Sequence, residues 1–379
     1  MSDPPRAGGA RLARSFLPGT AVLEMTYRCN HRCVFCSCPW EADHGDFARL
    51  PELTVEQWKP VLRRLAEMGV TDFAFTGGEP LLKEGLVELL EYAAGCETEH
   101  VVTADGVLQS RVGPPKLFLL SNGTSVDGAI LEVCRRLQIQ LSMSLPGLGT
   151  YREHTQAGDP DTVLQNFREA AAMGVATVAG ITVTRRNLPE LYQTIAAALL
   201  AGAGGVLLNR FLPGGRGLSH PDRLSLSWDE TRQMLDVAEQ ALRDAGRYGN
   251  VGTELPRCLL DDPTRYEHLE VGTRCSAVVR FFTIDPSGYV RVCNHSPVRL
   301  EPFDRIDAVK THPYWLRFVR KDYLPAACTG CGAAGDCDGG CREAAHIARG
   351  TLVGLDPLFA ADPPRLPHPP PVSQSSASK

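Results

Sequence analysis

Three cysteines lie within eight residues near the start of the chain, at the end of an expected strand. Cys29, Cys33 and Cys36 form a Cys-X3-Cys-X2-Cys triplet. Three thiolates at this spacing can close around one metal centre, but they leave a fourth ligand position empty. A structural zinc site normally takes four protein ligands, whereas iron–sulfur clusters are held by thiolates. The triplet therefore favours a cluster with one open iron over a zinc knuckle or a buried group of cysteines.

A pair of glycines follows the next expected strand along the chain. The motif consists of Gly77, Gly78, Glu79 and Pro80. Glycine has no Cβ, so a backbone that carries it can approach a ligand closely. The motif and the triplet together, with the aromatic Phe35 just before Cys36, resemble the signature of radical S-adenosylmethionine (SAM) enzymes. The resemblance covers residues 20–212.

The resemblance implies a cofactor and a chemistry. A 4Fe-4S cluster at the triplet would bind SAM through its open iron and cleave it reductively to a 5′-deoxyadenosyl radical, which takes a hydrogen atom from a C–H bond. The Gly-Gly-Glu-Pro motif would hold the amino group of SAM. Asn122 and Ser144 are further expected cofactor contacts, or else ordinary polar residues at strand ends. Arg210 could pair with a carboxylate inside the barrel or be a structural arginine.

Seven more cysteines lie between residues 258 and 341. They are Cys258, Cys275, Cys293, Cys328, Cys331, Cys337 and Cys341. Their spacing resembles the SPASM extension, a domain with auxiliary iron–sulfur clusters in radical enzymes that act mainly on peptides. A zinc ribbon would need a second Cys-X2-Cys pair, which this region lacks.

The resemblance also implies how these cysteines divide between one or two auxiliary clusters. The inner cluster would take Cys258, Cys275, Cys293 and Cys341. The outer cluster would take Cys328, Cys331 and Cys337. The family's last cysteine has no counterpart after Cys341. The remaining outer ligand is then expected to be Asp336, Asp338, His346, water or substrate.

One position counts against a particular branch of the family. Residues 281–284 and 289–293 are expected to form a hairpin that presents Cys293. Sulfatase maturases carry an aspartate base directly after the corresponding cysteine, and here that position is Asn294. An amide does not accept a proton at neutral pH. The neighbouring His295 titrates in a suitable range, but a lone histidine is more often structural. The catalytic residues therefore stay unassigned.

The order of elements predicts an α/β fold. Residues 20–212 alternate β-branched runs with helical patterns, which is typical of a parallel sheet with crossover helices. The expected strands are 21–26, 72–76, 117–121, 139–144, 177–184 and 205–211. The expected helices lie near 54–68, 82–95, 126–137, 161–174 and 188–201. Six such units predict a partial, TIM-like (β/α)6 barrel, with the triplet at the C-terminal mouth where active sites collect.

We expect five segments along the chain. They are a flexible N-terminus (1–19), the barrel (20–226), a linking helix (227–254), a small irregular cysteine-rich SPASM-like domain (255–350) and a tail (351–379) that is disordered from about 362. Within the barrel, 96–116 is too long for an ordinary loop. Residues 100–111 read as a hairpin around Asp105 and Gly106, either a tolerated insertion or a substrate-facing appendage.

Composition bounds the class of protein. The 379 residues suggest about two domains. The net charge of −5 gives no footprint for nucleic acid, and no apolar run reaches the roughly 20 residues that span a bilayer. Thirteen grouped cysteines suit metal binding in the reducing cytoplasm better than disulfides.

The resemblance to the SPASM extension implies a preferred substrate, a ribosomally synthesised precursor peptide that gains a cross-link, an epimerised centre or a related modification. Only about 20 residues precede the first strand, so we expect a separate leader-peptide-binding protein or leader-independent binding. A flavodoxin- or ferredoxin-type protein is the expected electron donor. Two alternatives stay open: a radical SAM dehydrogenase or epimerase acting on a small molecule such as an aminosugar, and a non-catalytic metal-binding scaffold.

Overall fold

The computed structural model describes residues 16–43, 47–104, 107–260 and 262–359. In these residues, ten strands form one sheet in the order β10–β9–β8–β7–β6–β5–β2–β1–β11–β12, and β3 pairs with β4 separately. The strands are β1 (Thr20–Glu24), β2 (Asp72–Thr76), β3 (Thr98–Ala104), β4 (Val107–Gly113), β5 (Lys116–Ser121), β6 (Gln140–Ser144), β7 (Thr177–Val183), β8 (Gly205–Arg210), β9 (Gly249–Val251), β10 (Leu269–Val271), β11 (Phe281–Ile284) and β12 (Val290–Arg291). The α-helices are α1 (Val55–Glu67), α2 (Leu86–Ala94), α3 (Gly128–Arg136), α4 (Tyr151–Thr155), α5 (Pro160–Ala172), α6 (Leu191–Leu200), α7 (Pro221–Leu224), α8 (Trp228–Ala245), α9 (Ile306–Val309), α10 (Pro313–Arg320) and α11 (Arg342–Arg349).

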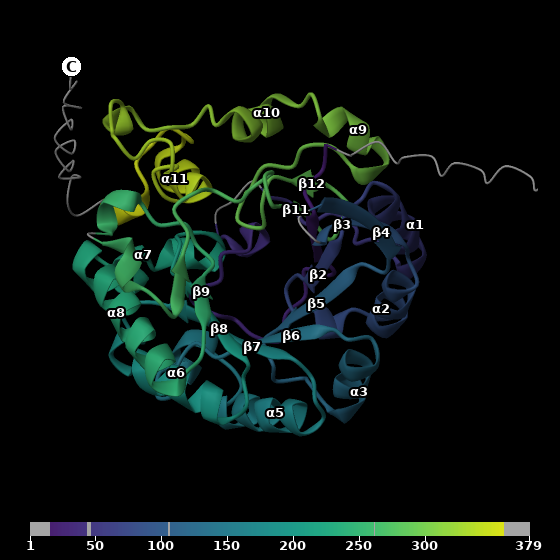
Figure 1. Cartoon of the computed structure of the whole chain (residues 1–379), viewed down its shortest axis with the longest axis horizontal. Helices are drawn as coiled ribbons and strands as arrows, with labels where there is room; N and C mark the ends of the chain where they lie inside the picture. Colours follow the sequence, from purple (N-terminus) through teal and green to yellow (C-terminus); the bar gives the residue numbers. More distant parts are fainter. Residues whose placement is uncertain (1–15, 44–46, 105–106, 261, 360–379) are drawn as a thin grey trace, which may run out of the picture.

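Six strands form the expected barrel wall. Strands β1, β2, β5, β6, β7 and β8 are neighbours in chain order, and every pair is parallel. Figure 1 shows the sheet curving round, with α1, α2, α3, α5, α6 and α8 on its outer side. The prediction of a partial (β/α)6 barrel is confirmed. Because the six strands are parallel, their C-terminal ends all lie at the same mouth of the barrel. The sequence predicted the triplet at this mouth.

Local sequence signals account for several helix ends. At the start of α1, the backbone N–H of Gln57 donates to Thr54 Oγ1, and the backbone N–H of Thr54 donates to Gln57 Oε1. This reciprocal pair is a capping box. The helix stops before Gly69, which has a φ of +81°. The α2 helix begins at Leu86, later than the predicted residue 82, because a 3-10 turn at Pro80–Leu82 comes first.

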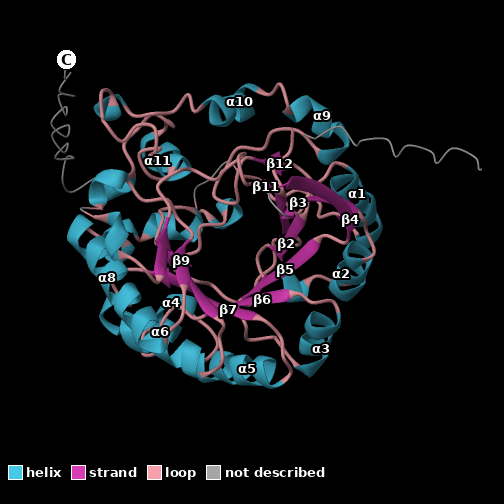
Figure 2. Ribbon diagram, viewed as in Figure 1, coloured by secondary structure: helices cyan, strands magenta, loops and turns pink. Residues whose placement is uncertain are grey.

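The residues after α8 extend the barrel sheet at both edges. The β9 strand pairs with β8, and β11 lies parallel to β1 with Thr20 opposite Phe281. The β11 and β12 strands form an antiparallel hairpin, as predicted, and Gly288 in its turn has a φ of +86°. Figure 2 shows this hairpin beside the barrel strands, with α9, α10 and α11 in an arc beyond it. Because β12 ends at Arg291, Cys293 follows directly at the barrel mouth.

Part of the expected tail packs on the body of the protein. Leu352 and Leu358 are buried, and the ring of Phe359 contacts that of Trp228 at 5.2 Å. The segment 351–359 therefore belongs to the folded structure, which the prediction of a tail from residue 351 did not foresee. The expected disorder from about residue 362, and the flexible start at 1–15, lie outside the described residues.

The segment 96–116 contains the predicted hairpin. Strands β3 and β4 pair antiparallel from Thr98 opposite Gly113 inward, while the turn residues Asp105 and Gly106 lie outside the described residues. Val101, Leu108 and Val112 are exposed on it. In the described part of the chain, no helix combines the length and apolar character needed to cross a bilayer.

Candidate active site

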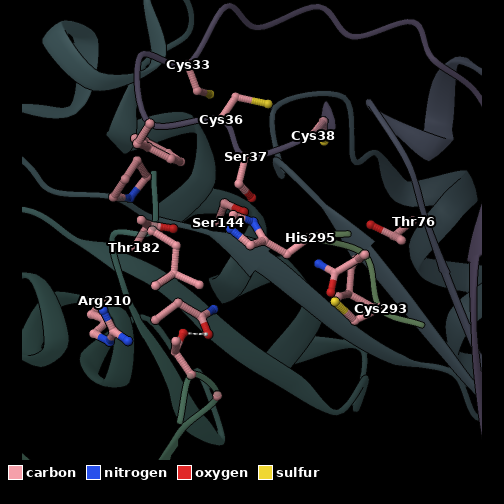
Figure 3. A pocket seen from close by; sticks show the side chains of 18 of the residues that line it. Cys33, Cys36, Ser37, Cys38, Thr76, Ser144, Thr182, Arg210, Cys293 and His295 are labelled. Carbon is pink, nitrogen blue, oxygen red and sulfur yellow. Dashed lines mark hydrogen bonds between the residues drawn. The ribbon is translucent and has the colours of Figure 1, made fainter. Parts of the chain in front are cut away.

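A cavity of about 380 Å³ lies at the C-terminal ends of the barrel strands. Its walls combine residues after β1, β2, β5, β6 and β8 with residues of the cysteine-rich region. The cysteines that line it are Cys29, Cys33, Cys36, Cys38, Cys275, Cys293 and Cys341. In Figure 3, Cys33 and Cys36 lie at the top and Arg210 at the lower left, while Cys293 lies at the right and His295 near the middle. One cavity therefore contains cysteines of both groups found in the sequence.

The triplet lies on the loop after β1, and the short helix α4 holds that loop in place. The backbone N–H of Val34 donates to the carbonyl of His154 (2.8 Å), and that of Arg32 donates to the carbonyl of Thr155 (3.1 Å). The ring of Phe35 lies 5.9 Å from that of His154. Sequence reasoning missed α4, although its residues fix the loop that carries all three cysteines.

The surroundings of the triplet shift the pKa values of its thiols in different directions. Burial is the main cause that raises the pKa of Cys29 to about 11 and that of Cys33 well above its usual range. The pKa of Cys36 is lowered, chiefly by a hydrogen bond with Cys38. A metal binds cysteine as thiolate, so loading the triplet must release protons.

The two glycines bring β2 against the triplet loop. A Cβ on Gly78 would lie 2.2 Å from the carbonyl oxygen of Arg28, and one on Gly77 would lie 2.7 Å from that of Thr26. The N–H of Gly78 donates to the carbonyl of Thr26 at 2.8 Å. Both glycines line the cavity. They allow close backbone contact between two loops, and they also leave that part of the wall without side chains.

Glu79 turns away from the cavity and joins β2 to β5. It is fully buried and accepts hydrogen bonds from Ser121 Oγ (2.9 Å), Asn122 N (2.8 Å) and Leu81 N (3.1 Å). Neither Glu79 nor Pro80 is part of the cavity lining. Within the Gly-Gly-Glu-Pro motif, the glycines thus face the cavity while the carboxylate holds the end of β5.

The remaining predicted cofactor contacts do reach the cavity. Ser144, Asn122, Phe35 and Arg210 all line it. Asn122 donates to Asn30 Oδ1 at 2.6 Å, which ties the end of β5 to the triplet loop. Arg210 forms a buried ion pair with Asp356 at 2.5 Å. Arg210 therefore pairs with a carboxylate of the protein itself, from the far end of the described chain, and its role as a cofactor contact stays a prediction.

The auxiliary cysteines form two groups, which differ from the predicted division. Cys275, Cys293 and Cys341 are buried and line the cavity. Cys258, Cys328, Cys331 and Cys337 are partly exposed. The residue before Cys258, Arg257, donates its backbone N–H to Cys337 Sγ at 3.3 Å. The structure therefore places Cys258 beside the outer cysteines, whereas the resemblance assigned it to the inner ones.

The three acceptors proposed for the missing outer ligand are engaged elsewhere. Asp336 is exposed and pairs with Arg274. Asp338 accepts from Cys275 N at 2.7 Å, on the inner side, and pairs with Lys321. His346 contacts Tyr314 and Glu343. This finding weakens the expectation that one of them completes the outer group.

The cysteine groups suit a cluster better than a single ion. All thirteen cysteines are free thiols. Zinc at about 2.3 Å from each sulfur requires ligands that converge tightly, and no three Cys, His, Asp or Glu side chains in the described ranges do so. An iron–sulfur cluster is larger than one ion and accepts more widely spaced thiolates. The donor set, rich in thiols, fits that alternative.

Several cavity residues were not anticipated from the sequence. Thr182, Asn209 and Thr253 line it, and Thr253 Oγ1 donates to Asn209 Oδ1 at 3.3 Å (Figure 3). The acids Glu254 and Glu343 also line it. The positions of Asn209 and Thr182 at strand ends are a signal that the sequence offered. Glu254 reaches the site from the loop after β9 and Glu343 from the first turn of α11, and the sequence offered no signal for either.

Comparisons with known proteins agree with this geometry. Residues 23–198 match the family model of the Radical SAM superfamily. The PqqA peptide cyclase of Gluconobacter oxydans is 26% identical over 356 residues, which cover 91% of this chain and 91% of that protein.

Solved structures of two proteins share the fold. SuiB of Streptococcus suis bound to SAM superposes with a TM-score of 0.66 at 15% identity, over 89% of this chain and 76% of SuiB, and SuiB bound to its precursor peptide SuiA gives 0.65 at 13%, over 90% and 75%. Native anSMEcpe with bound SAM and the Kp18Cys peptide gives 0.63 at 15%, over 90% of this chain and 94% of that one. The family match, the barrel and the cysteine triplet together show that residues 23–198 form a radical SAM domain, in a chain that is homologous to PqqA peptide cyclase over most of its length.

Proposed function

We propose that this protein is a radical SAM enzyme that modifies a ribosomally made precursor peptide, by a cross-link, an epimerisation or a related step. The observation that carries the proposal is the single cavity lined by the triplet, the glycine pair and three buried auxiliary cysteines. A relative that matches 91% of this chain is named as a peptide cyclase. The solved structures of the same fold include one with a precursor peptide and one with the Kp18Cys peptide.

In this proposal, Cys29, Cys33 and Cys36 hold a 4Fe-4S cluster. A bound cluster supplies the electron that splits SAM and so begins hydrogen abstraction; this chemistry belongs to the cofactor. The side-chain-free wall at Gly77 and Gly78 leaves room for SAM beside the triplet. Ser144 and Asn122 offer polar groups to it from neighbouring strand ends. Glu79 acts indirectly by holding the end of β5.

The rest of the chain orients the peptide and excludes water. The same cavity is also lined by Cys275, Cys293 and Cys341, the proposed ligands of an auxiliary cluster. The peptide would enter between these two groups. Phe281, Phe318 and Leu212 supply apolar lining there. A mostly apolar lining with a few placed polar groups is typical of sites that bury their ligand.

A small-molecule substrate is the weaker candidate. The relatives that match most of this chain are named for a peptide or were solved with one. A scaffold without activity is also weaker, because the intact triplet and glycine pair face one cavity.

We infer three further features of the setting. Reductive cleavage consumes an electron, so a flavodoxin- or ferredoxin-type donor is required. A separate leader-peptide-binding protein is a second partner. The cytoplasm is the proposed location, since free thiols and iron–sulfur centres persist in a reducing compartment.

The test is to identify short reading frames beside the gene, to co-express each encoded peptide with this protein, and to analyse the peptide by mass spectrometry. A mass change that depends on Cys33 and is absent in the Cys33→Ala variant is the expected result. Purified components then show whether a leader-binding protein is needed, by adding it or leaving it out. Modification of a sugar-pathway metabolite, with the peptide unchanged, would refute the peptide proposal and leave the radical SAM assignment intact.

A further inference from the structure

The three buried auxiliary cysteines form an inner group. Cys275, Cys293 and Cys341 all line the cavity. The pKa of Cys275 lies well above its usual range. Burial is the main cause, and the neighbouring charges of Glu254, Cys341 and Cys293 raise it further. The pKa of Cys293 is raised by burial and then by Glu343 and Cys341. The shared cavity wall, from which Cys258 is absent, and these mutual charge interactions therefore place the three thiols near one another.

The remaining four cysteines form an outer group. Cys337 Sγ accepts a hydrogen bond from Arg257 N (3.3 Å) and another from Gly339 N (3.2 Å). Burial raises the pKa of Cys258 to about 11, and the neighbouring thiolates of Cys337, Cys328 and Cys331 add to it. Cys258 thus lies next to three other thiols, all partly exposed to solvent.

The path of the chain explains this grouping. After β9, Gly252 N donates to Leu208 O (2.8 Å) and Leu255 N donates to Gly272 O (3.0 Å). These bonds bring Glu254 to the cavity wall and turn the next residues away from it, so that Cys258 emerges on the outer side. The 3-10 turn Arg257–Leu259 then fixes Cys258 beside Cys337.

We propose that Cys258 completes a four-thiolate outer cluster, and that the inner cluster is held by Cys275, Cys293, Cys341 and the carboxylate of Glu254. This proposal rests on the proposed function, because it requires iron–sulfur clusters in the cysteine-rich region. It goes beyond that function by assigning each ligand, including one that is not a cysteine.

Glu254 suits the remaining inner position better than the other nearby acids. Ser276 N donates to its Oε1 at 2.9 Å, which aims the carboxylate toward the residue after Cys275. Glu254 forms no ion pair with any residue that the structure describes. Asp338 pairs with Lys321 and Asp356 with Arg210, while Glu343 is held by Tyr314 and His346. Glu254 is therefore an acid beside Cys275 and Cys341 that forms no ion pair, although the charge of Arg210 also acts on it.

A carboxylate is a reasonable iron ligand, and it has consequences. Ligand type and solvent exposure set the reduction potential of such clusters. Replacing a thiolate by an oxygen ligand alters the spectrum of the cluster that carries it. The division into three thiolates inside and four outside therefore predicts two centres with distinguishable spectra.

The test begins with a chain that carries Cys29→Ala, Cys33→Ala and Cys36→Ala, so that its iron reports on auxiliary clusters alone. One derivative also loses the inner pair (Cys275→Ala, Cys293→Ala) and another loses the outer pair (Cys328→Ala, Cys331→Ala). Cys258→Ala is then added to each. Iron, acid-labile sulfide and Mössbauer spectra are measured after anaerobic reconstitution, with circular dichroism as the check on folding.

We expect Cys258→Ala to change the spectrum or remove about four irons only in the derivative that retains the outer cysteines. Cys258→Ser, which keeps the volume, should act in the same derivative. Cys134→Ala, on the buried face of α3, is the matched control and should change neither. An effect of Cys258→Ala confined to the derivative with the inner cysteines would overturn the division. Absence of iron and sulfide from the starting chain would instead refute the clusters themselves, and with them the proposed function.

The glutamate ligand is tested in the derivative that retains the inner cysteines. Glu254→Gln should shift the electron paramagnetic resonance signal of the reduced cluster, because an amide binds iron more weakly than a carboxylate. Glu270→Gln, at an exposed position of β10, is the control and should leave the signal unchanged. An identical signal in Glu254→Gln and the parent would exclude Glu254 as a ligand.

Discussion

Atomic contacts at Gly78 decide how closely the triplet loop lies against β2. A Cβ at this position would meet three backbone atoms of Tyr27 and Arg28 within 3 Å. These are main-chain atoms and cannot move aside as a flexible side chain would. The absence of a side chain at Gly78 is therefore a condition for the loop to adopt its position, in addition to leaving room for a ligand.

Gly78→Ala should destabilise the protein by about 1–3 kcal/mol, the usual cost of overpacking, and lower the iron content of the triplet. Gly128→Ala is the control, because a Cβ there meets nothing within 4 Å and the position is at the start of α3. Denaturant unfolding and iron analysis measure the two effects. Equal stability and equal iron in the two variants would contradict the steric argument.

The buried pair of Arg210 and Asp356 makes a second prediction at the same scale. Their side chains are 4% and 0% exposed. Removing one partner of a buried pair leaves an uncompensated charge and typically costs about 3–5 kcal/mol. Arg210→Met should therefore lower the free energy of unfolding more than the double variant Arg210→Met/Asp356→Asn. Equal losses in the single and double variants would show that the pair is not coupled.

At the scale of elements, the triplet loop depends on α4, and α4 depends on Glu190. The carboxylate of Glu190 accepts hydrogen bonds from the backbone N–H of Leu148 (3.1 Å), Gly149 (2.8 Å) and Thr150 (3.0 Å), just before α4 begins. Burial opposes ionisation, but the hydrogen bonds from Thr150, Gly149 and Leu148 prevail and hold the pKa of Glu190 below its usual value of 4.5.

Glu190→Gln should destabilise the protein at pH 7 by about 1–3 kcal/mol, the range for hydrogen bonds to a charged group. A depressed carboxyl pKa contributes stability above the unfolded value and loses it as the pH falls through the folded one. The deficit should therefore shrink as the pH drops below 4.5. Unfolding curves of both proteins across this range measure it, and a deficit independent of pH would argue against a role for the charge.

The elements that the sequence predicted well are those with local signals. The α1 helix was expected at 54–68 and is found at Val55–Glu67, since Thr54 and Gly69 mark its ends. By contrast, α4 has five residues and no side-chain cap. Glu190, 40 residues later in the chain, fixes its start, and no local pattern reveals such a contact.

The site shows the same limit. The triplet, the glycine pair and the auxiliary cysteines were recognised by spacing, which local sequence records. The partner of Arg210 and the grouping of Cys258 depend on which segments meet in space. Cys258 joins the outer group because Leu255 pairs with Gly272 and redirects the chain. Spacing alone assigned it to the inner group.

At the scale of the whole molecule, the segment after α11 connects the cysteine-rich region to the barrel. Asp356 Oδ2 accepts from Cys341 N at 2.7 Å as well as from Arg210. Leu358 joins the apolar cluster that contains residues of β7, β8 and α8. The end of the described chain thus supports both a proposed cluster ligand and the barrel.

A chain ending at Gly350 should unfold at a lower temperature and hold less auxiliary iron than a chain ending at Phe359. The shorter chain loses Asp356 and the burial of Leu358, while the longer one keeps both. Differential scanning fluorimetry and iron analysis compare the two. The prediction is falsified if the two chains have the same midpoint and the same iron content.

The central claim is that the triplet at the barrel mouth binds a cluster that cleaves SAM. The most direct measurement is the formation of 5′-deoxyadenosine and methionine from SAM by the reconstituted, dithionite-reduced protein under anaerobic conditions. We predict that the parent and the Cys134→Ala control form both products, and that Cys33→Ala forms neither while folding normally. Equal product formation by Cys33→Ala and the parent would contradict the account.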